Sequence, residues 1–201
     1  MEGYENWYST AGRRADLLEK ALLKRLLAAF PKAKSALEVG SGTGHFTRWL
    51  ANLGLEVIGL DLSAAMLREA IRTRDHPYVR GNTVALPFGT DSFDLVAMIT
   101  TLEFTVDPRL ALIEVLRVAR NGLILGVLNS QSRLGQRLRD EGGPVWSQGR
   151  FFSPHELIHQ VHGAAGVREL RVIWQTTLWP LWPGALPLPW GGFIGMAVRL
   201  L

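Results

Sequence analysis

The sequence predicts an α/β fold: a doubly wound, mostly parallel sheet of seven strands that ends in an antiparallel C-terminal hairpin. Three observations predict it. Short apolar segments typical of buried strands alternate with amphipathic helical segments. A glycine-rich turn follows the first strand. No helical segment separates the last two strands, so these are expected to pair with each other at one edge of the sheet.

The composition is that of a globular chain, for which a single domain spanning residues 1–201 is expected. Hydrophobic residues make up 47% of the sequence, enough for a continuous core. The net charge of +4 is spread along the chain, so no nucleic-acid partner is expected. The absence of cysteine excludes disulfides, thiolate zinc ligands and cysteine nucleophiles.

Two segments bear on the cellular location. The first thirty residues contain acidic side chains and no long apolar core, so no signal peptide is expected and a cytoplasmic location is the default. Residues 172–198 carry no charge, but four prolines break the segment. A helix in lipid would leave backbone groups unsatisfied at such breaks. We therefore expect no transmembrane segment there, but a Trp/Pro-rich loop at 178–192 followed by a strand.

In the first half of the chain, local signals set the element boundaries. Pro31 and Gly54 end helices, and Ser63 is expected to cap one. The expected elements are a helix over about 6–30 within an N-terminal helical cap at 1–30, a strand over 36–39, the glycine turn at 40–44, a helix over 45–53, a strand over 57–60, a helix over 63–74 and a brief strand over 78–80.

In the second half, two helix starts are the clearest signals. Asp107-Pro108 is typical of a helix start, and Ser153 with Glu156 predicts a capping box. The expected elements are a strand over 94–99, a helix over 107–119, a strand over 123–127, a helix over 153–163, and strands over 170–177 and 193–200.

The glycine turn is the strongest functional signal. Gly40, Gly42 and Gly44 allow a tight turn and the close approach of a ligand at the positive end of the next helix. A dinucleotide fingerprint needs its third glycine five residues after the first, whereas Gly44 comes four after Gly40. This spacing disfavours a pyrophosphate-binding turn.

Asp61 is the second signal. It ends the second strand, where a carboxylate can accept hydrogen bonds from both hydroxyls of a ribose. The alternative is a helix-capping or solvated aspartate.

With these signals in place, the chain resembles the class I S-adenosylmethionine-dependent methyltransferases, and among them the type 11 small-molecule group, whose fold is Rossmann-like. The resemblance runs in order from about residue 7 to 119 and more loosely to 200. The matching segments are 38–44, 59–63, 81–88, 91–96 and 110–120.

The resemblance implies S-adenosylmethionine as methyl donor and S-adenosylhomocysteine as product. The implied contacts are Glu38, Gly40, Ser41 and Gly42 to the methionine part, Asp61 to the ribose, Leu62 and Met66 to the adenine face, Asn82, Thr83 and Val84 to the adenine edge, and Ile99, Thr100 and Leu102 beside the methionine tail. Asn82 stands where the family usually has aspartate, and its amide oxygen can still accept a hydrogen bond.

Residues 7–14 are also similar to a segment that folds over the cofactor in this group. The resemblance implies that Tyr4, Trp7 and Tyr8 close the site and that Arg13 meets a carboxylate. The alternative is that the aromatic side chains pin a helix to the core.

Methyl transfer is an in-line displacement, so the protein must mainly align the reactants and exclude water, and a base is needed only for a protonated nucleophile. The acceptor is expected to be a small molecule. Glu103 is the candidate for a polar contact or a base, against a satisfied or solvated glutamate.

Other candidates are weaker. His155 and His159 have a metal-ligand spacing but no third ligand, so no metal site is expected. Arg133, Arg137 and Arg139 either meet an anionic substrate or form a solvated helix face. The Trp/Pro-rich loop at 178–192 has four readings: the wall of an acceptor pocket, a homodimer interface, a membrane contact or plain core.

Two rival functions stay open. One is a catalytically silent module that binds S-adenosylmethionine. The other is an NAD-dependent oxidoreductase, which the glycine spacing and the Leu86-Pro87-Phe88 segment disfavour.

The placement of Asn82 at the adenine gives a direct prediction. An Asn82→Ala variant should bind S-adenosylhomocysteine more weakly in calorimetry, because an acceptor for the adenine amino group is lost. Binding as tight as that of the wild type would show that the placement is wrong.

Overall fold

The computed structural model describes residues 10, 12–72, 76–179 and 183–201. The strands are β1 Ser35–Val39, β2 Glu56–Asp61, β3 Tyr78–Arg80, β4 Phe93–Ile99, β5 Ala119–Leu128, β6 Leu170–Thr177 and β7 Phe193–Leu200. The helices are α2 Arg13–Leu27, α3 His45–Asn52, α4 Ala64–Arg72, the 3-10 turn η1 Leu102–Phe104, α5 Pro108–Val118, α6 Arg133–Glu141, α7 Gly143–Trp146 and α8 Pro154–Ala165.

The described strands form one sheet of seven in the order β3-β2-β1-β4-β5-β7-β6. β1 pairs in parallel with β2 and β4, and the parallel pairing continues to β3 and β5. β7 runs antiparallel between β5 and β6. The predicted fold class, a mostly parallel sheet with an antiparallel C-terminal hairpin, is confirmed.

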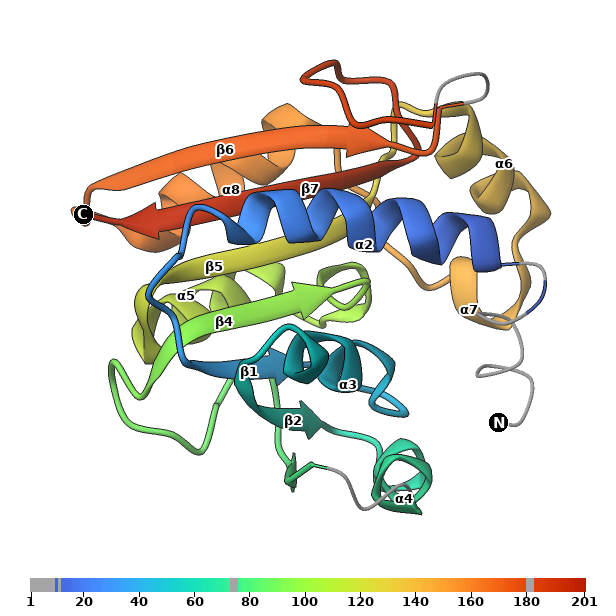
Figure 1. Cartoon of the computed structure of the whole chain (residues 1–201). Coiled ribbons are helices and arrows are strands. Elements are labelled where there is room, and N and C mark those ends of the chain that lie inside the picture. The colour runs from blue at the N-terminus through green and yellow to red at the C-terminus, as the bar shows by residue number, and fades with distance from the viewer. Residues whose placement is uncertain (1–9, 11, 73–75, 180–182) are drawn as a thin grey trace.

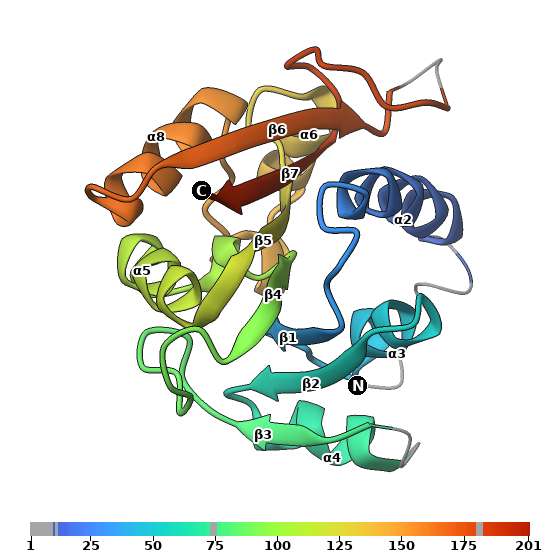
Figure 2. The same ribbon diagram turned by 60° about the vertical axis from the view of Figure 1, so that its left-hand side comes forward.

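Helices cover both faces of this sheet. Figures 1 and 2 show α2 and α3 on one face and α5 and α8 on the other. Each face has its own apolar cluster, because the central strands are buried on both sides. The cluster under α2 and α3 includes Leu22, Leu23, Phe46 and Leu50, and the cluster under α5 and α8 includes Leu112, Val115, Leu157 and Val161.

The first described helix lies across the C-terminal hairpin. α2 packs on β7 at Gly195, where a Cβ atom would lie 2.9 Å from side-chain atoms of both Leu22 and Leu26. Gly195 therefore lets the helix approach the strand closely. The helix predicted over about 6–30 begins at Arg13 in the described part of the chain, and residues 1–9 and 11 lie outside it.

Two predicted helix starts have the expected caps. The Asp107 carboxylate accepts a hydrogen bond from the Leu110 amide at 3.0 Å, with Pro108 at the first helical position. Ser153 and Glu156 form the reciprocal capping box of α8. Such caps depend on two residues a fixed distance apart, so the sequence reveals them.

The segment after β5 contains elements that the sequence did not predict. α6 and α7 occupy residues 133–146, and the Ser132 hydroxyl caps α6 by accepting from the Gly135 amide at 2.8 Å. α6 is rich in charged side chains, and its apolar stripe consists of only Leu134 and Leu138, which is too short to predict a helix.

The Trp/Pro-rich loop is tied to the sheet at both ends. Thr176 and Leu186 exchange backbone hydrogen bonds of 2.8 and 3.0 Å. The buried Asn129 amide donates to the carbonyls of Pro189 and Gly191 at 2.6 and 2.8 Å. Residues 180–182 of this loop lie outside the described part. No described helix is both long and apolar enough to cross a bilayer.

The packing of α2 on the sheet gives a paired test. Leu23 is completely buried, whereas Leu17 on the same helix is 59% exposed. Leu23→Ala should lower the free energy of unfolding by about 2–5 kcal/mol because it leaves a cavity. Leu17→Ala should change it by less than about 0.5 kcal/mol. Urea unfolding measures both, and equal effects would contradict this packing.

Candidate functional site

The candidate site is built on the turn from β1 into α3, at the carboxyl edge of the parallel strands. Gly40, Gly42 and Gly44 have φ angles of +77°, +53° and +85°. Residues with a Cβ atom rarely adopt this left-handed backbone conformation, so the turn itself requires glycine at these three positions. The amides of Gly40 and Ser41 both donate to the Leu60 carbonyl, at 2.7 and 2.9 Å, which fixes the turn against β2.

Asp61 at the end of β2 faces this turn. One carboxylate oxygen accepts from the Gly42 amide at 2.8 Å, and the other accepts from the Ser63 amide at 2.7 Å. Each carboxylate oxygen has two lone pairs, so one acceptor position per oxygen is left for a hydroxyl. A Cβ atom on Gly42 would have no atom within 4 Å, so the turn has open space on this side.

Glu38 is buried beneath the turn, with a side chain only 1% exposed. Burial raises the pKa of Glu38 to about 8, and the Asp61 charge adds to the rise. The Thr47 hydroxyl of α3 donates to the Glu38 carboxyl and opposes it. The Ser41 hydroxyl is also buried and has no hydrogen-bond partner among the described residues. A polar ligand group in the turn would satisfy it.

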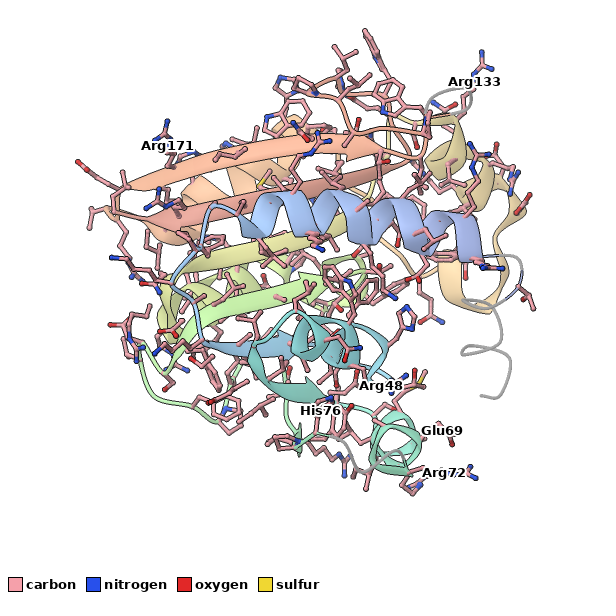
Figure 3. All side chains as sticks on the ribbon, viewed as in Figure 1. Arg48, Glu69, Arg72, His76, Arg133 and Arg171 are labelled. Carbon is pink, nitrogen blue, oxygen red and sulfur yellow. The ribbon has the colours of Figure 1, made fainter. Side chains whose placement is uncertain are left out.

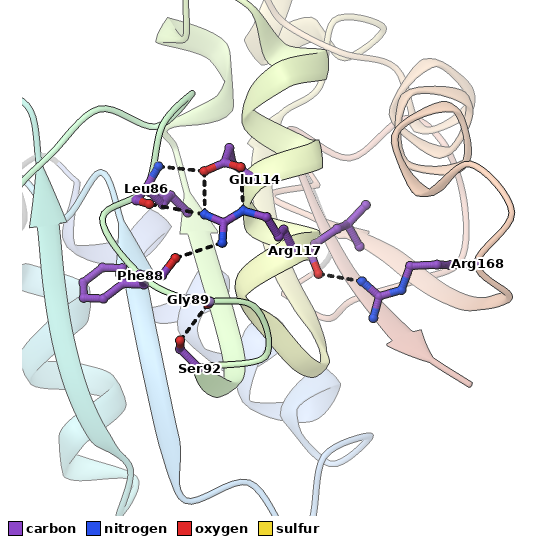
Figure 4. Close-up of polar contacts among 8 residues, drawn as sticks. Leu86, Phe88, Gly89, Ser92, Glu114, Arg117 and Arg168 are labelled. Atoms are coloured by element: carbon purple, nitrogen blue, oxygen red, sulfur yellow. Dashed lines mark hydrogen bonds and ion pairs between the residues drawn. The ribbon is translucent and has the colours of Figure 1, made fainter.

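The segment that follows β3 is clamped to α5 (Figure 4). The Glu114 carboxylate accepts from the Leu86 amide at 2.8 Å. The Arg117 guanidinium donates to the carbonyls of Phe88 and Leu86, at 2.8 and 3.2 Å, and pairs with Glu114. This ion pair lowers the pKa of Glu114 and raises that of Arg117. The clamp fixes the backbone of this segment at Leu86 and Phe88 against α5.

Within this segment, Asn82 makes a local bond. Its side-chain oxygen accepts from the Val84 amide at 3.2 Å, and the side chain is exposed. Thr83 and Val84 are half-buried. Leu62 is 59% exposed and Met66 half-buried on the neighbouring α4 side, so apolar surface is available there.

Residues 99–102, at the end of β4 and directly after it, lie beside Gly40, the first residue of the glycine turn. Thr100 has a φ of +50°, and its amide donates to the Gly126 carbonyl at 2.7 Å. The Thr101 hydroxyl lies 3.3 Å from the Gly40 carbonyl oxygen, and a Cβ on Gly40 would collide with this side chain. Ile99 and Leu102 are buried in the two core clusters. Their side chains pack in the core, so only backbone atoms are left to face a ligand.

Glu103 is buried at the ends of β4 and β5. One carboxyl oxygen accepts from the Leu128 amide at 2.7 Å, and the other has no hydrogen-bond partner among the described residues. Burial raises the pKa of Glu103 to about 7. The glutamate is thus only half satisfied.

The N-terminal half of α2 brings polar side chains that sequence analysis missed. Asp16 pairs with Lys20 and with His45 at the start of α3, at 2.9 and 2.7 Å, and Glu19 is 6% exposed. Their only signal in the sequence is that Glu19 shares the apolar face of α2 with Ala15 and Leu22. Arg13, predicted to meet a carboxylate, is exposed at the start of the helix. Tyr4, Trp7 and Tyr8 lie outside the described residues.

The remaining candidates lie away from the turn. Arg133, Arg137 and Arg139 are exposed on α6, and Figure 3 shows Arg133 pointing outward. Arg137 pairs with Glu141, and Arg139 donates to the Ser130 carbonyl. His155 and His159 are on α8, which covers the sheet face opposite α3.

A cavity of about 440 Å³ lies elsewhere, at the amino ends of the strands. Its lining includes Ser35, Glu56 and Phe93, the first residues of their strands. Ligands of open α/β sheets bind outside the carboxyl ends of the strands, so we place the candidate site at the glycine turn.

Comparisons with known proteins point to methyl transfer. A family profile described as "Methyltransferase domain" matches residues 37–126. The chain is 31% identical over 179 residues to the malonyl-[acyl-carrier protein] O-methyltransferase of Salmonella typhimurium, covering 88% of this chain and 68% of that protein. It is 40% identical over 87 residues to the demethylmenaquinone methyltransferase of Renibacterium salmoninarum, covering 43% of this chain and 37% of that protein.

A solved structure is similar over nearly the whole chain. It is a SAM-dependent methyltransferase, possible histamine N-methyltransferase, from Thermotoga maritima, with a TM-score of 0.81 and 30% identity. The alignment covers 98% of this chain and 95% of that one.

The buried carboxyl of Glu38 predicts an unusual pH dependence. A carboxyl whose pKa is higher in the folded state than its ordinary value of 4.5 holds its proton longer when folded. Its contribution to the free energy of unfolding is therefore complete below about pH 4.5 and is lost as pH rises toward 8. Glu38→Gln should flatten this slope by at most about 1.4 kcal/mol per pH unit.

Urea unfolding at several pH values between 5 and 8 measures this slope. The lowered carboxyl pKa values, such as that of Asp94, act below this window. The raised pKa values of Glu19 and Glu103 contribute to the slope of both proteins, so the difference in slope between the wild type and Glu38→Gln reports on Glu38. An unchanged slope in Glu38→Gln would show that this carboxyl ionises normally.

Proposed function

We propose that this chain, which belongs to the class I S-adenosylmethionine-dependent methyltransferases of the type 11 group, binds S-adenosylmethionine at the carboxyl edge of its sheet and methylates a small-molecule acceptor. The observation that carries the proposal is the hydrogen bond from the Gly42 amide to the Asp61 carboxylate. It lies on the side of the glycine turn where a Cβ atom on Gly42 would meet no other atom.

In this proposal the donor lies along the strand ends. Asp61 holds the ribose hydroxyls, and Leu62 and Met66 contact the adenine. Asn82 accepts from the adenine edge, which Thr83 and Val84 bound. The glycine turn, with Gly40, Ser41 and Gly42, and the backbone of residues 99–102 hold the methionine part above Glu38. The Ser41 hydroxyl gains the partner that it lacks among the described residues.

The donor supplies a methyl group already activated by a sulfonium. The protein contributes alignment, and the fixed backbone at Gly40 and Thr100 serves this purpose. Correct alignment alone supplies on the order of 7–11 kcal/mol toward such reactions. Tyr8 and Arg13 complete the site in this proposal, by covering it and by binding a carboxylate.

The names of the relatives indicate acceptors of different chemistry. One acts on a malonyl-acyl carrier protein, one on demethylmenaquinone, and the solved structure is described as a possible histamine N-methyltransferase. The chain spans only 37% of the demethylmenaquinone methyltransferase. We therefore infer the chemical class of the acceptor from the residues of this chain rather than from its relatives.

The role of Asp61 provides the main test. Asp61→Ala should weaken the binding of S-adenosylhomocysteine, measured by calorimetry, by about 10- to 150-fold, because hydrogen bonds to a charged acceptor are worth about 1.5–3 kcal/mol. Asp140→Ala, which changes an exposed aspartate of α6, should leave the affinity unchanged. Thermal unfolding of both variants checks that the fold survives, and equal affinities would contradict the proposed site.

A ligand comparison separates the rival functions. S-adenosylhomocysteine should raise the midpoint of thermal unfolding and NAD should not, because only a ligand of the native state stabilises it. The reverse result would favour an oxidoreductase. Binding without methyl transfer to any compound of a broad metabolite panel would favour a silent binding module.

A further inference from the structure

A cluster of titratable side chains lies at the carboxyl edge, beyond the end of β4. Figure 1 shows the N-terminal end of α2 on the side to which β1, β2 and β4 point, and η1 follows β4 there. The members of the cluster are Asp16, Glu19 and Lys20 of α2, His45 of α3 and Glu103 of η1.

The basic members of this cluster, Lys20 and His45, both pair with Asp16. Lys20 lies 2.9 Å and His45 2.7 Å from the two Asp16 oxygens, and the Lys20 and His45 nitrogens are 2.8 Å apart. These contacts, with desolvation opposing them, keep the pKa of Asp16 below its ordinary value. Asp16 is thus a neutralised carboxylate.

Glu19 and Glu103 are not part of this ion-pair network. Neither forms an ion pair with a basic side chain of the described residues, and residues 1–9 contain no Lys or Arg. Burial raises the pKa of Glu19 to about 8, the charges of Asp16 and Glu103 raise it further, and the charge of Lys20 partly opposes the rise. The charge of Glu103 on η1 thus acts on the Glu19 carboxyl of α2.

A second observation points to a ligand. Glu103 is only 1% exposed, yet one of its carboxyl oxygens has no partner among the described residues. A buried carboxylate without a counter-charge is several kcal/mol less stable than in water, roughly the penalty of taking one ion out of water. Such groups gather at functional sites, where a ligand supplies the missing partner.

The position of the pair matches the acceptor rather than the donor. Donor contacts proposed above run from residues 82–84 through Asp61 to the glycine turn, which follow β3, β2 and β1, and end at the backbone of residues 99–102 after β4. Glu103 lies farther along the same edge, bonded to Leu128 at the end of β5. Phe104, next to it, lies against Trp146, and Trp146 against Phe151, each with ring centroids 6.1 Å apart.

We propose that Glu19 and Glu103 form the acceptor site, and that the acceptor is an organic amine whose ammonium group binds between the two carboxyls. This inference rests on the proposed function. The aromatic side chains beside Glu103 favour an amine with an aromatic or apolar body. Acceptors that carry a carboxylate at the reacting end are disfavoured by repulsion from the same two groups.

Glu19 and Glu103 can also accept the proton that the acceptor ammonium must lose before methyl transfer. One ionised carboxyl takes a proton from the ammonium and leaves a neutral amine. The nitrogen lone pair then forms the new N–C bond as the S–C bond breaks, and that bond's electron pair stays on sulfur. The methylated nitrogen carries the positive charge, and the carboxyl passes its proton to water. The raised pKa values, about 8 for Glu19 and about 7 for Glu103, suit this transfer near neutral pH.

The test compares two probes with the same skeleton. Phenethylamine and 3-phenylpropionate are titrated into the wild-type protein saturated with S-adenosylhomocysteine, and binding is measured by calorimetry. We expect the amine to bind at least 10-fold more tightly than the carboxylate. Equal binding, tighter binding of the carboxylate, or no binding of the amine overturns the proposal.

Two isosteric variants test the residues. Glu19→Gln and Glu103→Gln should each weaken phenethylamine binding at least 10-fold while the affinity for S-adenosylhomocysteine changes less than twofold. In Glu103→Gln the amide oxygen can still accept from the Leu128 amide, so the fold is preserved. Glu141→Gln, at an exposed ion pair of α6, is the matched control and should change neither affinity.

The outcomes are distinguishable. Unchanged amine binding in both variants overturns the acceptor site. Equal losses of amine and S-adenosylhomocysteine binding would instead assign the carboxyls to the amino group of the donor, and overturn it as well. If the wild type fails to bind S-adenosylhomocysteine at all, the proposed function itself fails, separately from this inference.

Discussion

The turn that carries the chain from β1 into α3 determines where everything else in the site lies. Its left-handed glycines bring two successive amides onto the Leu60 carbonyl, so β1 and β2 are joined at their ends as well as along their length. The next glycine presents its amide to Asp61. The proposed donor contacts depend on this junction, because it fixes the distance between the turn and the Asp61 carboxylate.

Buried carboxyl groups form a second layer beneath and beside this turn. Glu38, Glu19 and Glu103 are each nearly inaccessible, and burial raises the pKa of each. Such groups destabilise a fold when they ionise. Their concentration at one edge of the sheet indicates that this edge is shaped by function, because the opposite edge, at the amino ends of the strands, contains no comparable group among the described residues.

Much of the fold could be predicted from sequence, because its signals are local. Strands β1, β2 and β4 have short apolar runs, and the caps of α5 and α8 need only neighbouring residues. The family resemblance is confirmed by the comparisons. The α6 helix was missed because charged side chains dominate it. Residues Asp16 and Glu19 were missed because His45 and Glu103, which lie near them, come from α3 and η1, and contacts between distant segments leave no periodic trace in one sequence.

The position of β7 has a consequence for how the protein is made. The strand built from residues 193–200 lies between β5 and β6, both of which are synthesised before it. Until residues 193–200 leave the ribosome, the β5 and β6 edges that pair with β7 remain open, and open strand edges are prone to pair with other chains. The sheet of the nascent chain therefore stays incomplete until β7 pairs with both neighbouring strands.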